Sequence, residues 1–330
     1  MGKNGFALEM KSQELETAKV VAIPVPWGMT GYGFDGSDKN AAVSILEAFS
    51  NFNAYDPRFG DEADFALIDS PVSGEHVYGK AEAYLNWTGN GRNPDSLKVE
   101  MMKHLEDVDI QSHKMVKSVR KASTEILALE KIPCVIGGDH STALGLMQAL
   151  TAKYQEFSIL QLDAHMDLKD PGLNFEFSHS SVMHHAAKLE QAKKFFQVGV
   201  RDFSKEEYAR ASKERKRFFM YTARSISRGI YGSGNDWMEV VEQILRKIDE
   251  CVYISFDIDV LEPYLCPNAA RQVPGGLNFE QVFFLIEALV EYGIKIIGFD
   301  LSEVATEPAD VLVGARALQR LSANTSYSWH

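Results

Sequence analysis

The chain has 330 residues, of which 45% are hydrophobic and 24% charged, a composition typical of a globular protein. It carries 34 Lys and Arg against 46 Asp and Glu, a net charge of −12, which argues against nucleic acid or an anionic membrane surface as a partner. Three cysteines without ligand-like spacing argue against a disulfide framework, and no stretch reaches the roughly 18 apolar residues that a membrane helix needs.

In chain order, residues 1–16 contain no apolar signal core, and we expect them to be a poorly ordered extension of a cytoplasmic protein. Short apolar runs then predict strands at 19–26, 64–72, 132–138, 157–164, 195–201, 217–223, 251–258 and 294–301. Segments of helical period lie at 39–51, 97–129, 141–153, 180–193, 236–249, 278–292 and 309–321. The Gly- and aromatic-rich segment 73–94 matches neither pattern and is expected to be an irregular lid or oligomer contact.

The pattern of these elements predicts the fold class. Nearly continuous apolar strands are typical of parallel sheets that are buried on both faces. Their alternation with helices predicts a three-layer α/β/α fold with a mostly parallel sheet of about eight strands. No repeat or linker interrupts the pattern, so we expect 1–330 to be a single domain.

Side chains of types that coordinate metal ions follow four of the predicted strands. They are Asp139 and His140 in "GGDHS", Asp163, His165 and Asp167 in "DAHMD", Asp257 and Asp259 in "FDIDV", and Asp300 and Glu303 in "FDLSEV". Because the carboxyl ends of parallel strands lie along one edge of a sheet, these clusters are expected to converge in one crevice.

Each cluster also has a structural interpretation. Asp139 stands between a Gly-Gly turn and a helix, and we favour a helix cap for it. Asp257 and Asp259 alone fit a metal site and a loop anchor equally well, and the neighbouring clusters favour metal. A helix cap does not explain the "DAHMD" triple, because one cap needs only one carboxylate. Residues two apart on a strand share a face, so all three side chains of the triple would crowd together. A bound cation explains that triple better.

The candidate ligands indicate the kind of metal. They comprise two imidazoles and four carboxylates: His140, Asp163, His165, Asp167, Asp257 and Asp259. One ion rarely needs so many protein ligands, whereas two ions bridged by carboxylates would use them all. Oxygen-rich ligation with some imidazole favours Mn²⁺, with Co²⁺, Ni²⁺ and Zn²⁺ as weaker candidates. Two such ions activate water near neutral pH, which points to a hydrolase.

In this order and spacing, "GGDHS", "DAHMD" and "SFDIDVLEP" resemble the arginase/agmatinase/formiminoglutamase (ureohydrolase) family. "PVPWGMTGYG", "VGVRDFSKEE" and "VGARAL" extend the resemblance over nearly the whole chain, and "FSHSSVM" with "LCPNAARQVPGG" is most similar to agmatinase-type members. The resemblance implies an arginase-like fold, two Mn²⁺ per chain and a homotrimer or homohexamer. It implies cleavage of a small guanidino compound to urea and an amine, with agmatine, the precursor of putrescine in polyamine metabolism, as the expected substrate.

The resemblance also implies residue roles. One ion would be held by His140, Asp163, Asp167 and Asp257, and the other by Asp163, His165, Asp257 and Asp259. Glu303 would pair with the substrate guanidinium. His179 in "FSHSS" would assist proton transfer at the site mouth, and it or Asp167 would protonate the departing amine. His184 and His185 are expected to be structural.

Three places depart from the family pattern near the expected substrate mouth. Arg271 stands where relatives often read Thr-Gly-Thr; facing the pocket it would repel a distal ammonium and attract a carboxylate, while facing solvent it would matter little, and the sequence leaves both open. Ser204, which we expect to contact the substrate, stands where arginases carry the Asp that contacts the head of arginine, and this disfavours L-arginine. The segment 36–43 lacks the usual Gly-Pro.

These departures keep other interpretations open. A carboxylate-bearing guanidino or formimino acid, such as 4-guanidinobutyrate or formiminoglutamate, is the alternative substrate class. A single-zinc deacetylase arrangement on the same fold would need fewer ligands. A metal-binding but inactive subunit of a heteromeric enzyme is a third possibility, and the intact Glu303 and His179 argue against it.

Overall fold

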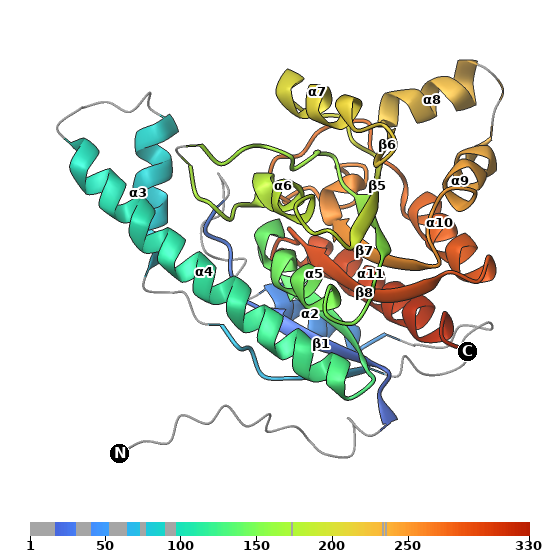
Figure 1. Cartoon of the computed structure of the whole chain (residues 1–330), viewed down its shortest axis with the longest axis horizontal. Helices are drawn as coiled ribbons and strands as arrows, with labels where there is room; N and C mark the ends of the chain where they lie inside the picture. Colours follow the sequence, from blue (N-terminus) through green and yellow to red (C-terminus); the bar gives the residue numbers. More distant parts are fainter. Residues whose placement is uncertain are drawn as a thin grey trace.

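Eight parallel strands form one sheet through the centre of the molecule, in the order β2-β1-β3-β8-β7-β4-β5-β6 (Figure 1). The computed structural model describes residues 17–30, 41–52, 65–72, 77–89, 97–172, 174–232, 234 and 236–330. The strands are β1 (Val20–Val25), β2 (Phe65–Leu67), β3 (Ile132–Gly137), β4 (Phe157–Leu162), β5 (Ala192–Val198), β6 (Phe218–Tyr221), β7 (Cys251–Asp257) and β8 (Lys295–Ser302). The predicted α/β class and the eight-stranded parallel sheet are confirmed.

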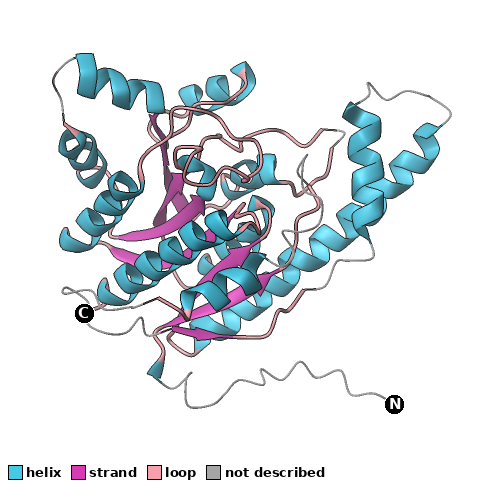
Figure 2. Cartoon of the chain, turned by 180° about the vertical axis from the view of Figure 1, so that it is seen from behind, coloured by secondary structure: helices cyan, strands magenta, loops and turns pink. Residues whose placement is uncertain are grey.

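Helices cover both faces of this sheet (Figure 2). They are α2 (Ala41–Phe49), α3 (Tyr78–Gly89), α4 (Lys98–Ala128), α5 (Leu144–Leu150), α6 (Val182–Ala186), α7 (Lys205–Lys213), α8 (Ala223–Gly232), α9 (Trp237–Leu245), α10 (Phe279–Glu291) and α11 (Pro308–Tyr327). None of the helices in the described residues is both long and apolar enough to cross a bilayer.

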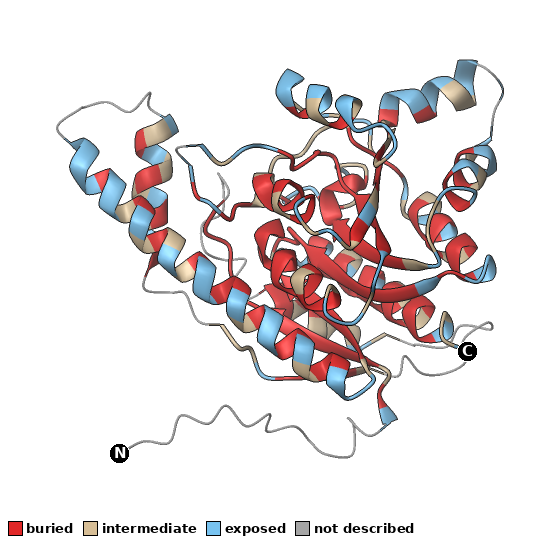
Figure 3. Ribbon diagram, in the orientation of Figure 1, coloured by how far each residue is buried: buried red, intermediate tan, exposed pale blue. Residues whose placement is uncertain are grey.

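Strand side chains alternate between two separate cores, as the period of two requires. Val21 and Ile23 of β1 join a core with residues of α3, α4, α5 and α6. Val20 and Ala22 join a second core with residues of α2, α9, α10 and α11. The strands are therefore buried on both faces, and the helices expose their outer sides (Figure 3). This is the predicted three-layer arrangement.

The expectation that segment 73–94 is irregular was wrong for its described residues, 77–89. Its residues 78–89 form α3, and two aromatic residues lie on its buried face: Ala81, Tyr84 and Trp87 recur every three residues, a helical spacing. Tyr84 packs against Phe175, with ring centroids 5.3 Å apart. The glycines at both ends of this short helix resemble loop composition and obscured it.

The helix predicted at 180–193 was wrong in extent. Only Val182–Ala186 is α-helical, and β5 already begins at Ala192. Phe195 and Phe196 lie in the predicted strand 195–201 and are both fully buried, one in each core, as the alternation of a strand requires. Helices α7 and α8 were missed because their exposed faces make the segments too polar for an apolar period to stand out.

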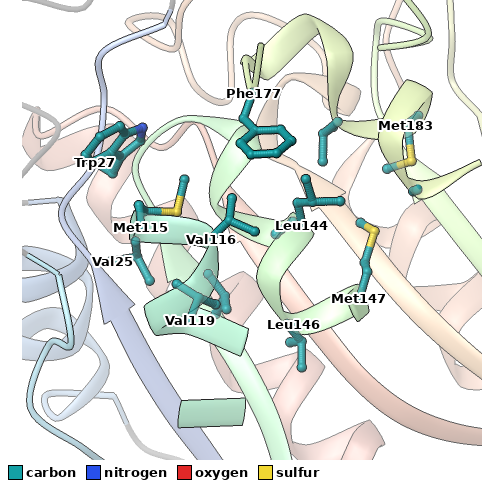
Figure 4. Close-up of a cluster of buried hydrophobic side chains, with 14 of the residues drawn as sticks. Val25, Trp27, Met115, Val116, Val119, Leu144, Leu146, Met147, Phe177 and Met183 are labelled. Atoms are coloured by element: carbon teal, nitrogen blue, oxygen red, sulfur yellow. The ribbon is translucent and has the colours of Figure 1, made fainter. Parts of the chain in front are cut away.

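Helix α4 packs directly on α5 through buried hydrophobic side chains (Figure 4). At Gly145 an added Cβ would lie 2.6 Å from the carbonyl oxygen of Val116, so only glycine permits this approach. The predictions for 1–16 and for 36–40 within the 36–43 segment lie outside the described residues.

Candidate metal centre

The candidate ligands lie at the carboxyl ends of three strands. His140 follows β3, Asp163, His165 and Asp167 follow β4, and Asp257 and Asp259 end and follow β7. The sheet order β3-β8-β7-β4 brings these ends together. All six side chains are buried, so their charges are removed from bulk water.

Their atoms form two groups that share Asp163. His140 Nδ1 lies 2.9 Å from Asp167 Oδ2, 3.2 Å from Asp163 Oδ2 and 3.5 Å from Asp257 Oδ2. His165 Nδ1 lies 2.9 Å from Asp259 Oδ2 and 3.5 Å from Asp163 Oδ1. Within the described residues, His140, Asp163 and Asp167 form one group able to hold an ion, and Asp163, His165 and Asp259 form another.

The hydrogen bonds of His140 show that a cation fits here. Its Nε2 lies 2.8 Å from Ser255 Oγ, and that hydroxyl donates its single hydrogen to Asp300 Oδ1 at 2.8 Å. The imidazole must therefore donate from Nε2. Its Nδ1, which is buried without a hydrogen bond, faces three carboxylates and needs positive charge beside it, either a proton or a metal ion.

Crowding of the carboxylates also requires positive charge in this cluster. Burial, with the charge of Asp163, raises the pKa of Asp167 to about 7. Burial, with the charges of Asp259 and Asp163, raises the pKa of Asp257 well above its usual value. For His165, burial opposes protonation, but the bonds to Asp163 and Asp259 raise its pKa to about 10. Protons stabilise this cluster of like charges, and divalent cations could replace them.

Buried polar residues outside the predicted set hold the ligands. Gln161 Nε2 donates to Asp163 Oδ2 at 2.8 Å, and Gln197 Nε2 donates to Gln161 Oε1 at 2.7 Å. Tyr253 donates to Asp300 Oδ1 at 2.6 Å. Sequence reasoning missed these supporting residues, although a lone amide inside the apolar strands β4 and β5 was an available signal.

Two candidate residues have strained backbones. Asp167 has φ 53° and Glu303 has φ 64°, in the left-handed region that side chains other than glycine rarely adopt. Glu303 is buried, its amide donates to the carbonyl of Gly138 at 2.7 Å, and its Oε1 accepts from the amide of His140 at 2.9 Å. Burial, with the charge of Asp139, raises its pKa well above the usual value. Glu303 thus lies next to His140, a candidate ligand.

Asp139 caps the turn of His140–Ala143, as predicted, accepting from the amide of Ser141 at 3.0 Å. Its other oxygen accepts from the Thr30 hydroxyl at 2.8 Å. Thr30 Oγ1 in turn accepts from the amide of His179 at 3.0 Å and lies 3.5 Å from His179 Nδ1. Trp27 and Phe177, near Thr30 and His179 in the chain, belong to the same core cluster (Figure 4).

Arg271 lies beside His179. Its Nη1 lies 3.2 Å from His179 Nε2, and its Nη2 lies 3.6 Å from Asp202 Oδ2. Burial, with the neighbouring Arg271 charge, lowers the pKa of His179 to about 3. His179 is therefore neutral at neutral pH and accepts from the guanidinium at Nε2.

Ser204 and the other histidines have structural contacts. Ser204 caps α7, accepting from the amide of Glu207 at 3.2 Å, and lines a cavity of about 600 Å³ beside the His179 segment. Its contact with substrate stays a prediction. His184 and His185 lie on α6; His184 Nδ1 lies 2.5 Å from Arg210 Nη1, and the His185 ring nitrogen Nε2 lies 2.8 Å from the carbonyl of Glu176.

A parallel α/β/α sheet that gathers buried imidazoles and carboxylates at one edge defines an α/β protein with a candidate divalent-metal centre. The model of the arginase family matches residues 18–321, and the chain belongs to that family. It is an arginase-family ureohydrolase, a hydrolase that acts on C–N bonds of amidines. The family is generally metal-dependent, in agreement with the clusters described above.

Several proteins resemble the chain. The N(1)-aminopropylagmatine ureohydrolase of Thermus thermophilus is 31% identical over 296 residues, covering 89% of this chain and 85% of its own. An uncharacterized 32.2 kDa protein of Methanothermus fervidus is 32% identical over 191 residues, and the match covers 58% of this chain and 62% of that protein. The structure of the agmatine ureohydrolase of Thermoplasma volcanium has a TM-score of 0.73 at 21% identity, covering 98% of this chain and 96% of its own.

Proposed function

We propose that the protein hydrolyses a guanidino compound to urea and an amine, with two Mn²⁺ ions bound at the strand ends. The observation that carries this proposal is the pair of imidazole Nδ1 atoms that face one shared carboxylate, Asp163, inside a buried group of four aspartates. His140, Asp163, Asp167 and Asp257 would hold one ion, and Asp163, His165, Asp257 and Asp259 the other. Bound there, the ions would supply Lewis acidity and lower the pKa of water.

The residues of the chain would bind substrate and move protons. Glu303 would pair with the planar guanidinium through parallel charge-assisted hydrogen bonds, which fixes the carbon for attack. Water adds to that carbon, its oxygen remains in urea, and both of its protons end on the departing nitrogen, which leaves as an alkylammonium. Asp167 and His179 are the candidates for passing a proton from the water to that nitrogen, because an unprotonated amide anion is too poor a leaving group.

Agmatine is the substrate expected from the resemblance. The Thermus thermophilus protein is named for an agmatine derivative, and the Thermoplasma volcanium protein is named for agmatine. A carboxylate-bearing guanidino or formimino acid is a second candidate, favoured by the position of Arg271 beside His179. A homotrimer or homohexamer and a cytoplasmic location complete the proposal, and light scattering on the purified protein would test the assembly.

A urea-release screen tests the reaction. Protein loaded with Mn²⁺ is offered agmatine, 4-guanidinobutyrate, arginine and guanidine, and ammonia and formamide are assayed with formiminoglutamate. We expect the native protein to release urea from at least one guanidino compound and to bind two ions per chain. Asp163→Asn should lose both the urea release and the bound ions. One bound ion would support the single-zinc arrangement instead. Two ions without any product would contradict hydrolysis and favour an inactive subunit.

A further inference from the structure

The turn that carries Arg271 is fixed on both sides. Before it, the amide of Asn268 donates to Asp310 Oδ1 at 3.0 Å; after it, Arg201 Nε donates to the carbonyl of Val273 at 2.8 Å. Arg271 itself has φ 54°, a conformation that arginine adopts only where the surroundings impose it. The side chain is 28% exposed and ends at His179. Its position beside the site is therefore set by the fold.

The charge of Arg271 is poorly neutralised by protein. His179 is uncharged at neutral pH, because burial and this same cation lower its pKa to about 3. Within the described residues, the carboxylate paired with Arg271 is that of Asp202, 3.6 Å away on a side chain that is 57% exposed. A pair so exposed contributes little, because water screens it. Lys169 adds a second positive charge near His179. Among the described residues, this exposed Asp202 is therefore the one carboxylate that partly balances the positive charge of Arg271.

We propose that Arg271 is a specificity-determining residue that binds a carboxylate at the far end of the substrate, so that the enzyme prefers a guanidino carboxylic acid to a guanidino amine. This inference rests on the proposed hydrolysis and names its substrate class. Glu303 would take the guanidinium end, while Arg271, on the His179 side, would contact the other end.

The acidity of the whole chain opposes this preference, and distance decides between the two effects. A net charge of −12 attracts cations, but charges beyond a Debye length of about 8 Å are largely screened at physiological salt. Arg271 would act within that distance. Two unit charges at about 6 Å with an effective dielectric constant of about 20 interact strongly enough to change affinity roughly 100-fold, and partial solvation reduces this to about 10-fold.

Two matched pairs of compounds test the proposal. Agmatine and 4-guanidinobutyrate share the guanidinium and differ in the charge of the tail; putrescine and 4-aminobutyrate are the corresponding amines, which cannot be hydrolysed. Urea release gives the ratio of kcat/KM for the first pair, and calorimetry on the Mn²⁺-loaded protein gives the ratio of Kd for the second. The variants are Arg271→Gln, Arg271→Lys and, as a control, Arg228→Gln, an exposed arginine on α8.

We expect the native protein and Arg228→Gln to favour 4-guanidinobutyrate over agmatine in kcat/KM by about 10-fold. Both should also bind 4-aminobutyrate about 10-fold more tightly than putrescine. Arg271→Gln should lose that preference, while Arg271→Lys should keep most of it; thermal unfolding confirms that each variant folds. Ratios unchanged within about twofold in Arg271→Gln, or a native preference for the ammonium compounds, would overturn the inference even if urea is released. A Kd preference that depends on Arg271 without urea release would instead support the inference and contradict the proposed hydrolysis.

Discussion

At His140 a single hydroxyl hydrogen decides which ring nitrogen faces the carboxylates. Ser255 gives that hydrogen to Asp300, so the imidazole donates from Nε2 and presents Nδ1 to Asp163, Asp167 and Asp257. Partners of this kind fix the tautomer and the orientation of a ligand, and their loss typically costs 10- to 100-fold in metal affinity.

We therefore expect Ser255→Ala to bind Mn²⁺ about 10- to 100-fold more weakly than the native protein, measured by metal titration. Ser158→Ala is the matched control: it removes another buried strand serine that donates to an aspartate, Asp249, at the opposite end of the sheet. Equal metal affinity in the two variants would show that Ser255 does not orient His140.

Thr30 offers a second test at this scale, because it links Asp139 to both the amide and the ring of His179. Thr30→Val keeps the shape and removes the hydroxyl; we expect kcat to fall about 10-fold or more, with Mn²⁺ affinity unchanged. Thr30→Ser restores the hydroxyl and should restore kcat. A fall in metal affinity instead of kcat would mean that Thr30 supports the ligands rather than His179.

Sequence reasoning found the candidate ligands more readily than the residues that form hydrogen bonds to them. The carboxylates and imidazoles stand out because they interrupt apolar strands at alternate positions. Gln161, Gln197 and Ser255 interrupt strands too, but a single amide or hydroxyl is compatible with many structural roles. The side of the turn to which Arg271 points depends on long-range bonds to Asp310 and Arg201, which no local pattern reveals.

At the scale of elements, the sheet followed from its apolar runs, whereas short amphipathic helices did not. The aromatic residues and terminal glycines of helix α3 resemble a loop when its sequence is considered alone. Its helical period becomes clear only once its buried face is seen to pack on α4. The same α4 also supports the His179 segment: Asp109 Oδ1 accepts from the amide of Glu176 at 2.8 Å. The length and position of α4 thus matter for the site as well as for the core.

The Asp109 contact predicts a pH dependence. Burial, with the charge of Glu176, raises the pKa of this carboxyl from 3.8 to about 6, while the hydrogen bond from the Glu176 amide and His113 oppose the rise. The folded state therefore binds the proton more tightly than the unfolded state. The carboxyl destabilises the folded protein above pH 6, and this cost disappears as pH falls towards 4.

Asp109→Asn keeps an acceptor oxygen and removes the charge. We expect it to raise the free energy of unfolding by about 1 kcal/mol near pH 8, after allowance for partial exposure, and to have little effect near pH 4. Urea denaturation at both pH values measures this. Asp107→Asn is the control, because Lys80 lowers the pKa of Asp107 through a hydrogen bond and no gain is expected. A gain for Asp109→Asn that is equal at both pH values would exclude titration as its cause.

At the scale of the whole molecule, the candidate ligands follow three strands that are far apart in sequence. The segments that follow β3, β4 and β7 meet only because the sheet places β8 and β7 between β3 and β4. The four carboxylates that meet there repel one another, so the fold holds in place a cluster that would separate in the unfolded chain. A ligand that binds only the folded arrangement stabilises it by mass action.

Metal removal should consequently lower the melting temperature of the whole chain. At a Mn²⁺ concentration about 100-fold above Kd, each site would add about 2.7 kcal/mol to the free energy of unfolding, enough to raise Tm by several degrees. The gain should shrink near pH 5, because protons compete for Asp167, whose pKa is raised to about 7 by burial and by Asp163.

Differential scanning calorimetry of chelator-treated protein, with and without added Mn²⁺, measures this shift in the native chain, in Asp163→Asn and in Asp170→Asn, an exposed aspartate of the loop after β4. Asp163→Asn removes the carboxylate shared by both groups, so its shift should vanish, while Asp170→Asn should behave as the native chain does. A shift that survives in Asp163→Asn would place the bound ion elsewhere, since one amide cannot replace a carboxylate bridging two cations.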